Sequence, residues 1–277
     1  MPVRPSDEAM LEVRQSNRLD VLAQQLVARL ATPGDGGVLE QDVVVVQSPG
    51  MATWLRHRIA EQQQIAAAIE FPLPASFLWR VVRALVPAVP EHSPFDKRGS
   101  RWHLLRLLGP GSELLADPRC ERLARYLADD ETGLKRFQLA ERIADVLDQY
   151  LVYRPDWLRR WGAGEDTPEL VENEPWQPLL WRALVAAVRE RLGGDAATQD
   201  RATLTARARA RLEQEDCRPL LRAAGLPGRI AVFGISAMPP EQLRLLLALS
   251  AHLDVVLHAF NPCRQYWTDI VSEAYLA

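Results

Sequence analysis

The sequence of 277 residues is poor in lysine and cysteine and has no long apolar run. Its three cysteines, Cys120, Cys217 and Cys263, are odd in number and far apart, so they indicate neither a disulfide framework nor a zinc site. No apolar stretch approaches the roughly 18 residues that a membrane-spanning helix needs, and the start lacks the apolar core of a signal peptide. We therefore expect a cytoplasmic protein with no membrane contact.

The shortage of lysine bears directly on nucleotide binding. Of the 33 basic residues only Lys97 and Lys135 are lysines. A Walker-type loop needs a lysine between a glycine and a Ser or Thr, because its ammonium reaches the phosphates while the hydroxyl holds magnesium. Lys97 lies in FDKR and Lys135 in GLKR, and the turn at Gly50 continues as Met-Ala-Thr. The sequence therefore predicts no ATPase centre and no cofactor.

Other catalytic patterns are also missing. Asp129, Asp130 and Glu131 come closest to a nuclease cluster, with Lys135 four residues after Glu131, but a solvated helix start is the favoured interpretation. The five histidines form no metal motif and accompany no evident nucleophile. His258 lies among apolar residues, which is typical of a hydrogen-bonded core histidine. We predict no catalytic and no metal-binding residues.

Charge does not decide the class of partner. The formal net charge is −3 and 48% of the residues are hydrophobic, an ordinary composition for one or two globular domains. Such a charge argues against a simple basic nucleic-acid binder but permits one that keeps its cations on a single surface. The excess of arginine reflects either a GC-rich genome, which is favoured, or use of its fork-shaped donors.

The order of elements predicts an α/β fold with a parallel sheet. Strands are expected at residues 11–16, 43–46, 230–233 and 254–260, with Ser16 or Asn17 capping the first helix. The middle of the chain shows only helical periodicity, clearest at residues 139–150, and Pro155 is expected to end that helix or to open the next. We therefore expect a flexible leader at 1–9, one discontinuous α/β domain formed by 10–99 and 226–277, and an all-helical insertion at 100–225.

Two features suggest a binding surface. Trp79 lies off the apolar stripe of its helix, beside Arg80 and Arg83, which fits either stacking on a base or, more favoured, packing. Asp145 and Asp148 lie opposite an apolar stripe, where a solvated acidic face is favoured and acceptance of hydrogen bonds from base amino groups is the alternative.

A third feature is an aromatic patch in the middle of the helical region. Four tryptophans alternate there with arginines, and core packing is favoured for most of them. The residues are Trp157, Trp161, Trp176 and Trp181, with Arg154, Arg159, Arg160 and Arg182.

Several segments, in order, resemble the RecC family, the gamma subunits of exodeoxyribonuclease V (RecBCD). The most specific are residues 45–55 (VVQSPGMATWL) and 71–77 (FPLPASF) followed by Trp79. The others are residues 16–22 (SNRLDVL), 137–139 (FQL), 148–157 (DQYLVYRPDW), 233–240 (FGISAMPP) and 261–267 (NPCRQYW). The resemblance spans nearly everything after Met10, and because RecC proteins are several times longer, it implies an amino-terminal piece.

The resemblance implies a superfamily 1 helicase-like (P-loop NTPase-like) domain that lacks the ATP-binding residues, with its inserted helical domain. It implies a scaffold that has no enzymatic activity of its own. Such a subunit binds single-stranded and duplex-end DNA, splits the duplex for the RecB and RecD motors and scans the 3′-ended strand for the Chi sequence.

The family's Chi-reading positions match Gln47, Leu73, Trp79, Asp145, Asp148, Arg154 and, less closely, Arg201. By the resemblance, Gln47 bonds a base edge, Leu73 and Trp79 pack or stack on bases, and the two aspartates accept from base amino groups. Arg154 either holds Asp148 or touches DNA. Pro49, Thr53 and Val146 depart from the family pattern, so no particular Chi octamer is predicted. The alternative is a scaffold that only holds the RecB and RecD motors.

Overall fold

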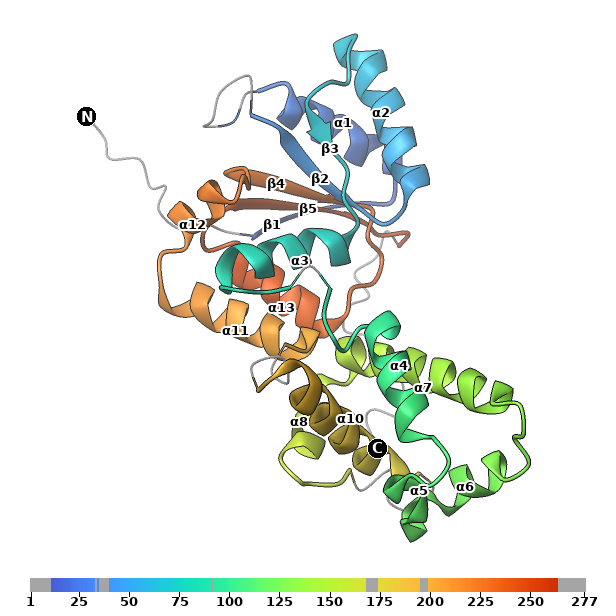
Figure 1. Cartoon of the computed structure of the whole chain (residues 1–277). Helices are drawn as coiled ribbons and strands as arrows, with labels where there is room; N and C mark the ends of the chain where they lie inside the picture. The colour runs from blue at the N-terminus through green and yellow to red at the C-terminus, as the bar shows by residue number, and fades with distance from the viewer. Residues whose placement is uncertain are drawn as a thin grey trace, which may run out of the picture. The chain divides into compact units, whose positions relative to one another are not determined.

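The computed structural model describes residues 11–32, 34, 40–90, 92–167, 174–194 and 199–263. It divides into two compact units, one formed by Met1–Leu85 with Ala208–Ala277 and the other by Val86–Arg207 (Figure 1). The predicted leader at 1–9 lies outside the described residues. Our predicted domain boundaries fall near 100 and 226, whereas the units divide near 86 and 208. The helicase-like assignment of these parts stays a prediction.

The first unit contains the predicted parallel sheet. Its strands are β1 (Leu11–Ser16), β2 (Asp42–Val46), β3 (Ile69–Glu70), β4 (Arg229–Phe233) and β5 (Asp254–Phe260). They lie in the order β1-β5-β4-β2-β3, and every neighbouring pair is parallel. The α/β class is therefore confirmed. The two-residue strand β3 was not predicted, because so short a segment carries no periodicity.

Helices cover both faces of this sheet (Figure 1). On one face lie α1 (Leu19–Leu30) and α2 (Pro49–Gln63), and on the other lie α3 (Pro74–Leu85) and α13 (Pro240–Leu249). Val44 and Val46 pack with α1 and α2 in one apolar cluster. Since successive strand residues point to opposite faces, the equally buried Val43 and Val45 face the other helices. An unbroken valine run is what a strand covered on both faces requires.

The start of α1 differs from the prediction. Its N-cap residue is Arg18, whose side chain makes no capping hydrogen bond. Ser16 instead accepts a 3.1 Å hydrogen bond from the Arg18 backbone N–H, which closes a tight turn between β1 and α1. The predicted cap at Ser16 or Asn17 was therefore wrong, because the serine stabilises the turn before the helix.

The described part of the second unit is helical. It contains α4 (Lys97–Leu107), α5 (Glu113–Ala116), α6 (Glu121–Leu127), α7 (Leu134–Tyr153), α8 (Pro155–Gly162) and α10 (Trp176–Leu192), with a short 3-10 turn at Pro118–Cys120. Pro155 opens α8 at its first turn, as predicted. The core is formed mainly by α4, α7, α8 and α10 around the fully buried Trp161.

The helix α11 (Arg201–Gln214) contains the boundary between the units, and α12 (Arg218–Ala223) follows it. The end of α11 belongs to the first unit because it is bonded there: the Arg211 guanidinium donates to the Leu85 carbonyl at 2.6 Å. The His252 ring lies 2.8 Å from the Leu212 carbonyl and accepts from the Cys217 backbone N–H at 3.4 Å. These bonds explain why the second segment of the first unit begins at Ala208 rather than near the predicted residue 226.

Among the described residues, none of the helices has both the length and the apolar character that crossing a membrane would require.

Candidate functional site

Gln47 and Leu73 both lie at the carboxyl edge of the sheet, in two segments that run next to each other. Gln47 is exposed and directly follows β2, while Leu73 directly precedes α3 and is 41% exposed. The residues before them are joined by a 3.0 Å hydrogen bond from the Val46 backbone N–H to the Pro72 carbonyl. The Leu73 carbonyl in turn accepts from Phe77 in the first turn of α3. Two predicted site residues from separate segments therefore share one exposed edge.

The loop after β4 closes against the same edge. Gly234 has a left-handed backbone (φ +66°), and a Cβ placed on it would lie 3.3 Å from the Met51 Cε in the first turn of α2. From β2 the chain turns to α2 on one face, and from the neighbouring β4 it turns to α13 on the other. In open α/β sheets, ligands bind outside the carboxyl ends of two such diverging strands. Gln47 stands at this position.

The turn between β2 and α2 is stabilised by its own side chains. Ser48 accepts a 3.2 Å hydrogen bond from the Met51 backbone N–H, and Pro49, which has no N–H, occupies the first helical position. Both lysines lie in the other unit, where Lys97 pairs with Asp145 and Lys135 with Asp129. The turn that begins α2 therefore carries no lysine and consists of a capped helix start with proline at its first position.

Trp79 lies in the second turn of α3 and is half-buried. The predicted apolar stripe of this helix, Leu78, Val81, Val82 and Leu85, is buried as expected. Arg80, next to Trp79, donates to the Glu70 carboxylate at 2.7 Å, which ties α3 to the end of β3. Trp79 thus belongs to the helix that follows Leu73. This helix is held by its buried apolar residues and by the bond from Arg80 to Glu70.

Asp145 and Asp148 lie one turn apart on α7, in the second unit. Asp145 forms an ion pair of 2.9 Å with Lys97 at the start of α4 and a longer one of 3.7 Å with Arg142. Asp148 is half-buried. The favoured interpretation of a solvated acidic face was therefore wrong, since α4 covers this side of α7 and supplies a cation to it.

Arg201 acts on Asp148 across a long sequence separation. Burial raises the pKa of the Asp148 carboxyl, and the neighbouring charges of Asp96 and Asp145 raise it further. The positive charges of Arg201 and Lys97 lower the same pKa and only partly offset these effects. The structure thus groups Asp145, Asp148 and Arg201.

Arg154 lies apart from this group, between the end of α7 and the start of α8. It is exposed, and its guanidinium lies 5.3 Å from the centre of the Trp157 ring, within the limit of about 6 Å for a cation–π contact. The positive charges that act on Asp148 in this structure are those of Arg201 and Lys97. Arg154 remains available as an exposed cation.

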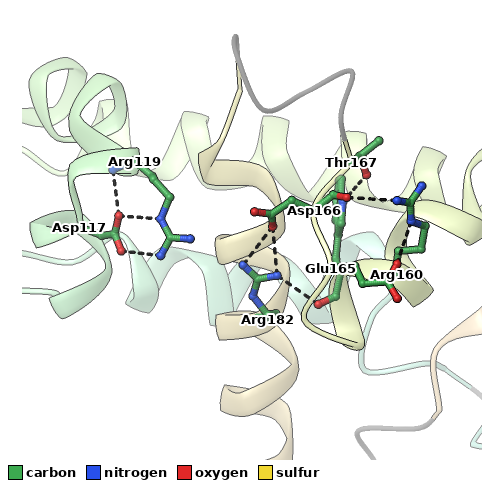
Figure 2. A network of polar contacts seen from close by, with 8 residues as sticks. Asp117, Arg119, Arg160, Glu165, Asp166, Thr167 and Arg182 are labelled. Carbon is green, nitrogen blue, oxygen red and sulfur yellow. Dashed lines mark hydrogen bonds and ion pairs between the residues drawn. The ribbon is translucent and has the colours of Figure 1, made fainter.

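The predicted aromatic patch is mainly core, as favoured. Trp161 and Trp181 are buried, and Trp157 and Trp176 pack against the same cluster. The Trp161 indole N–H donates to the buried Thr167 hydroxyl at 2.6 Å. Figure 2 shows the polar network around this bond, in which Arg160 pairs with Glu165 at 3.2 Å and Arg182 with Asp166 at 3.4 Å.

The acidic segment before α7 stabilises that helix. The Asp130 carboxylate accepts hydrogen bonds from the backbone N–H groups of Lys135 and Arg136, at 3.2 and 2.9 Å, and Asp129 pairs with the Lys135 ammonium at 2.7 Å. This confirms the predicted helix start, because carboxylates satisfy the unpaired N–H groups of the first turn. Within the described part of the chain, no three His, Cys, Asp or Glu residues group closely enough to hold a metal ion.

His258 is fully buried in β5, as predicted for a core residue. Burial lowers the pKa of its ring to about 4, so the ring is neutral at pH 7. The predicted hydrogen bond is weak in this structure: within the described residues neither ring nitrogen has a partner in good hydrogen-bonding geometry, and the backbone of Val232 on β4 has only a minor effect on the pKa of the ring. The ring instead packs 5.7 Å from the ring of Phe233 on the neighbouring strand.

Sequence reasoning missed Asp96 and Lys97 as neighbours of the α7 carboxylates. Asp96 caps α4 by accepting from the Gly99 backbone N–H at 2.8 Å, which places Lys97 in the first turn, facing Asp145. The capping pattern was readable in the sequence. The packing of α4 on α7 could not be predicted from the sequence. The facing residues, such as Lys97 and Asp145, lie about 50 positions apart, and no local pattern indicates a contact at that separation.

The comparisons with known proteins agree with one another. The family model described as "RecC, N-terminal domain" matches residues 11–277. The chain is 42% identical over 268 residues to the RecBCD enzyme subunit RecC of Escherichia coli K12, covering 97% of the chain and 23% of that relative. It is 35% identical over 281 residues to the same subunit of Haemophilus influenzae Rd, covering 94% and 24%. It is 29% identical over 273 residues to the RecBCD enzyme subunit RecC of Mycobacterium tuberculosis, and this match covers 93% of the chain and 23% of that relative.

The chain spans about a quarter of the length of these curated relatives. The segments that carried the resemblance meet in the fold: Val46 bonds to Pro72, Gly234 lies against Met51, and the Asn261 backbone N–H donates to the Ser16 carbonyl at 3.0 Å. From the match over residues 11–277 and these identities, the chain belongs to the RecC family.

Proposed function

We propose that this chain is a non-catalytic, DNA-binding part of a RecBCD helicase-nuclease that acts in double-strand break repair and homologous recombination. In this proposal the chain contacts the 3′-ended single strand after the duplex has been split and takes part in reading Chi. The RecB and RecD subunits are its partners, and the ATP-driven and nucleolytic steps belong to them.

The observation that carries the proposal is the exposed pair formed by Gln47 and Leu73. An exposed polar side chain with both donors and acceptors and an exposed apolar one lie at the same sheet edge, which is the edge where this class of fold binds ligands. Base recognition needs that combination, because base edges offer hydrogen bonds and base faces offer apolar contact. Trp79, on the helix that follows Leu73, offers a flat apolar surface of the same kind.

The second unit carries a separate set of groups that are suited to base recognition. Asp145 and Asp148 can accept hydrogen bonds from cytosine or guanine amino groups, and the cations Lys97 and Arg201 reduce their repulsion of the phosphates. Each well-placed base contact contributes about 1–3 kcal/mol of discrimination between bases. A few such contacts are enough to distinguish one short sequence from the rest of a strand.

The test uses the full-length subunit assembled with RecB and RecD. Alanine at Trp79 and at Asp148 is expected to abolish the Chi-dependent attenuation of the complex while leaving unwinding intact. Trp54→Ala, which removes another half-buried tryptophan of the first unit, and Asp129→Ala, which removes an exposed acid of the second, are the matched controls. An unchanged Chi response in both site variants would refute the assignment.

A chain that only holds the motors would bind no DNA itself. The two functions are separated by measuring the affinity of the chain for single-stranded DNA over a range of salt concentrations. Contacts between arginine and phosphate predict that the logarithm of the binding constant falls by about 0.7 per contact for each unit of log salt. A chain with no salt-dependent binding would support the scaffold function instead.

A further inference from the structure

One face of α4 carries a row of residues that the site described above does not use. Arg98, Trp102 and Arg106 lie four residues apart, and by 100° per residue they share the side of the helix opposite its buried residues Ser100 and Leu104. We call these three residues the α4 stripe. Trp102 is 55% exposed and both arginines are exposed. An exposed tryptophan between two exposed arginines is unusual for a solvated helix face.

The two arginines of the stripe are not neutralised. Within the described residues neither Arg98 nor Arg106 forms an ion pair, whereas other arginines of this unit, such as Arg101 and Arg125, do. The charge of Arg106 also adds to that of Arg191 on α10. Burial lowers the pKa of His103, and these two guanidinium groups lower it further. The surface along α4 is therefore locally positive although the chain as a whole is slightly acidic.

The indole of Trp102 is held in place from one side. The Arg101 guanidinium lies 5.0 Å from the centre of the Trp102 ring and 5.4 Å from that of Phe137 on α7. The two rings are 6.3 Å apart, and Arg101 is itself held by Glu141 at 3.3 Å. A ring that is braced by its neighbours loses little side-chain entropy when a flat ligand stacks on its exposed surface.

The stripe begins beside the α7 carboxylates. Lys97, which precedes Arg98, is the residue that pairs with Asp145 at 2.9 Å. From Arg98 to Arg106 the helix rises by about 12 Å, at 1.5 Å per residue. That length corresponds to about three or four nucleotides of one stacked strand, whose phosphates are about 3.4 Å apart along the axis.

We infer that the α4 stripe is a second, sequence-independent binding site for single-stranded nucleic acid, in which a base stacks on Trp102 and phosphates bind Arg98 and Arg106. Stacking is tolerant of sequence because every base has a flat face, and the arginines supply the electrostatic term. This inference rests on the proposed function in one respect, namely that the bound polymer is a nucleic acid. It concerns residues other than the Chi-reading ones.

The experiment measures fluorescence anisotropy of a labelled oligothymidylate, about 20 nucleotides long, with the 277-residue chain between roughly 50 and 200 mM salt. Trp102→Ala is expected to weaken binding about 5- to 140-fold, the range that loss of one stacked base gives, while Trp102→Phe keeps most of the affinity. The double variant Arg98→Gln, Arg106→Gln is expected to reduce the slope of log affinity against log salt by about 1.4.

The control double variant is Arg125→Gln, Arg218→Gln, which removes the same charge from two exposed, ion-paired arginines. It should leave the slope unchanged. Thermal unfolding of each variant shows that the fold is intact. Equal effects of the two double variants, or unchanged binding by all stripe variants, would overturn the inference and leave the stripe as a protein-contact surface. So would absence of binding by the unaltered chain at low salt.

The two proposals fail in different ways. If the stripe variants bind like the unaltered chain while Asp148→Ala still abolishes the Chi response of the complex, the stripe is wrong and the proposed function stands. If the stripe variants lose affinity and slope as expected while Trp79→Ala and Asp148→Ala leave the Chi response unchanged, the stripe stands and the Chi-reading assignment is wrong.

Discussion

Replacement of Gly234 tests how the loop after β4 is held against the edge that carries Gln47. The backbone of Gly234 is left-handed, with φ +66°, and its missing Cβ would lie 3.3 Å from the Met51 Cε. A left-handed backbone costs an ordinary residue about 1–2 kcal/mol. Because the Met51 methyl is the end of a flexible side chain, it can move aside, so we attribute the cost to the backbone.

We therefore expect Gly234→Ala to lower the free energy of unfolding in urea by about 1–2 kcal/mol. Asparagine tolerates the left-handed region, so Gly234→Asn should lose less than half of that. In a double-mutant cycle with Met51→Ala, the coupling energy should stay below about 0.5 kcal/mol. Equal losses for the alanine and asparagine variants, or a coupling of about 1 kcal/mol or more, would refute this reasoning.

Three further predictions concern the second unit and the cysteines. The pKa of the Asp148 carboxyl is raised in the folded chain, so the folded chain binds the proton of this carboxyl more tightly than the unfolded chain does. The stabilisation of the fold by this protonation is therefore present at low pH and is lost as the pH rises from about 4 through the raised pKa. The stability of Asp148→Asn relative to the unaltered chain should therefore increase from pH 3 to pH 7, and a constant difference would contradict the shift. Thr167→Val should lower the free energy of unfolding in urea by about 1–3 kcal/mol, because the buried Trp161 N–H loses its acceptor. Thr167→Ser, which keeps the hydroxyl, should lower it much less. Equal losses in the two variants would mean that the hydroxyl is not the acceptor. Burial raises the pKa of Cys120 to about 11, so iodoacetamide at pH 8 should label the exposed Cys263 in the folded chain and Cys120 only after unfolding, and labelling of both at one rate would show that Cys120 is accessible.

The strands of the central sheet were predictable because both faces are covered. Residues 43–46 and 230–233 are apolar at every position, and they form β2 and β4 with only one residue added at the start of each. The stop of α7 and the start of α8 followed from Pro155 in the same way. In these places the burial of a strand on both faces, or the fixed backbone of a proline, appears directly in a few consecutive residues, so the sequence alone was sufficient to predict the element.

The candidate site was predictable only in part. The exposed positions of Gln47 and Leu73 agree with a surface role, but they came from the family resemblance rather than from a local pattern. The pairing of Asp145 with Lys97 and the charge of Arg201 near Asp148 depend on how helices far apart in the sequence pack. Hydrophobic periodicity gives the buried side of each helix but not which polar groups meet across the contact.

The α7 carboxylates illustrate why the solvated interpretation was reasonable yet wrong. On an isolated helix, Asp145 and Asp148 lie opposite the apolar stripe and should face water. In the structure Asp96 caps α4 in a way that brings Lys97 against Asp145, and burial by the surrounding helices raises the pKa of Asp148. The polar side of α7 is therefore an interface between helices, which is where a group with an altered pKa is expected.

The most direct test of DNA reading by this chain is photochemical cross-linking of a single strand that carries photoreactive bases along its length. We expect the cross-linked peptides, identified by mass spectrometry, to include the segments around Leu73 and Trp79 in the first unit and around Asp148 in the second. Cross-links confined to segments that contain none of these residues would contradict the claim that they contact the bases.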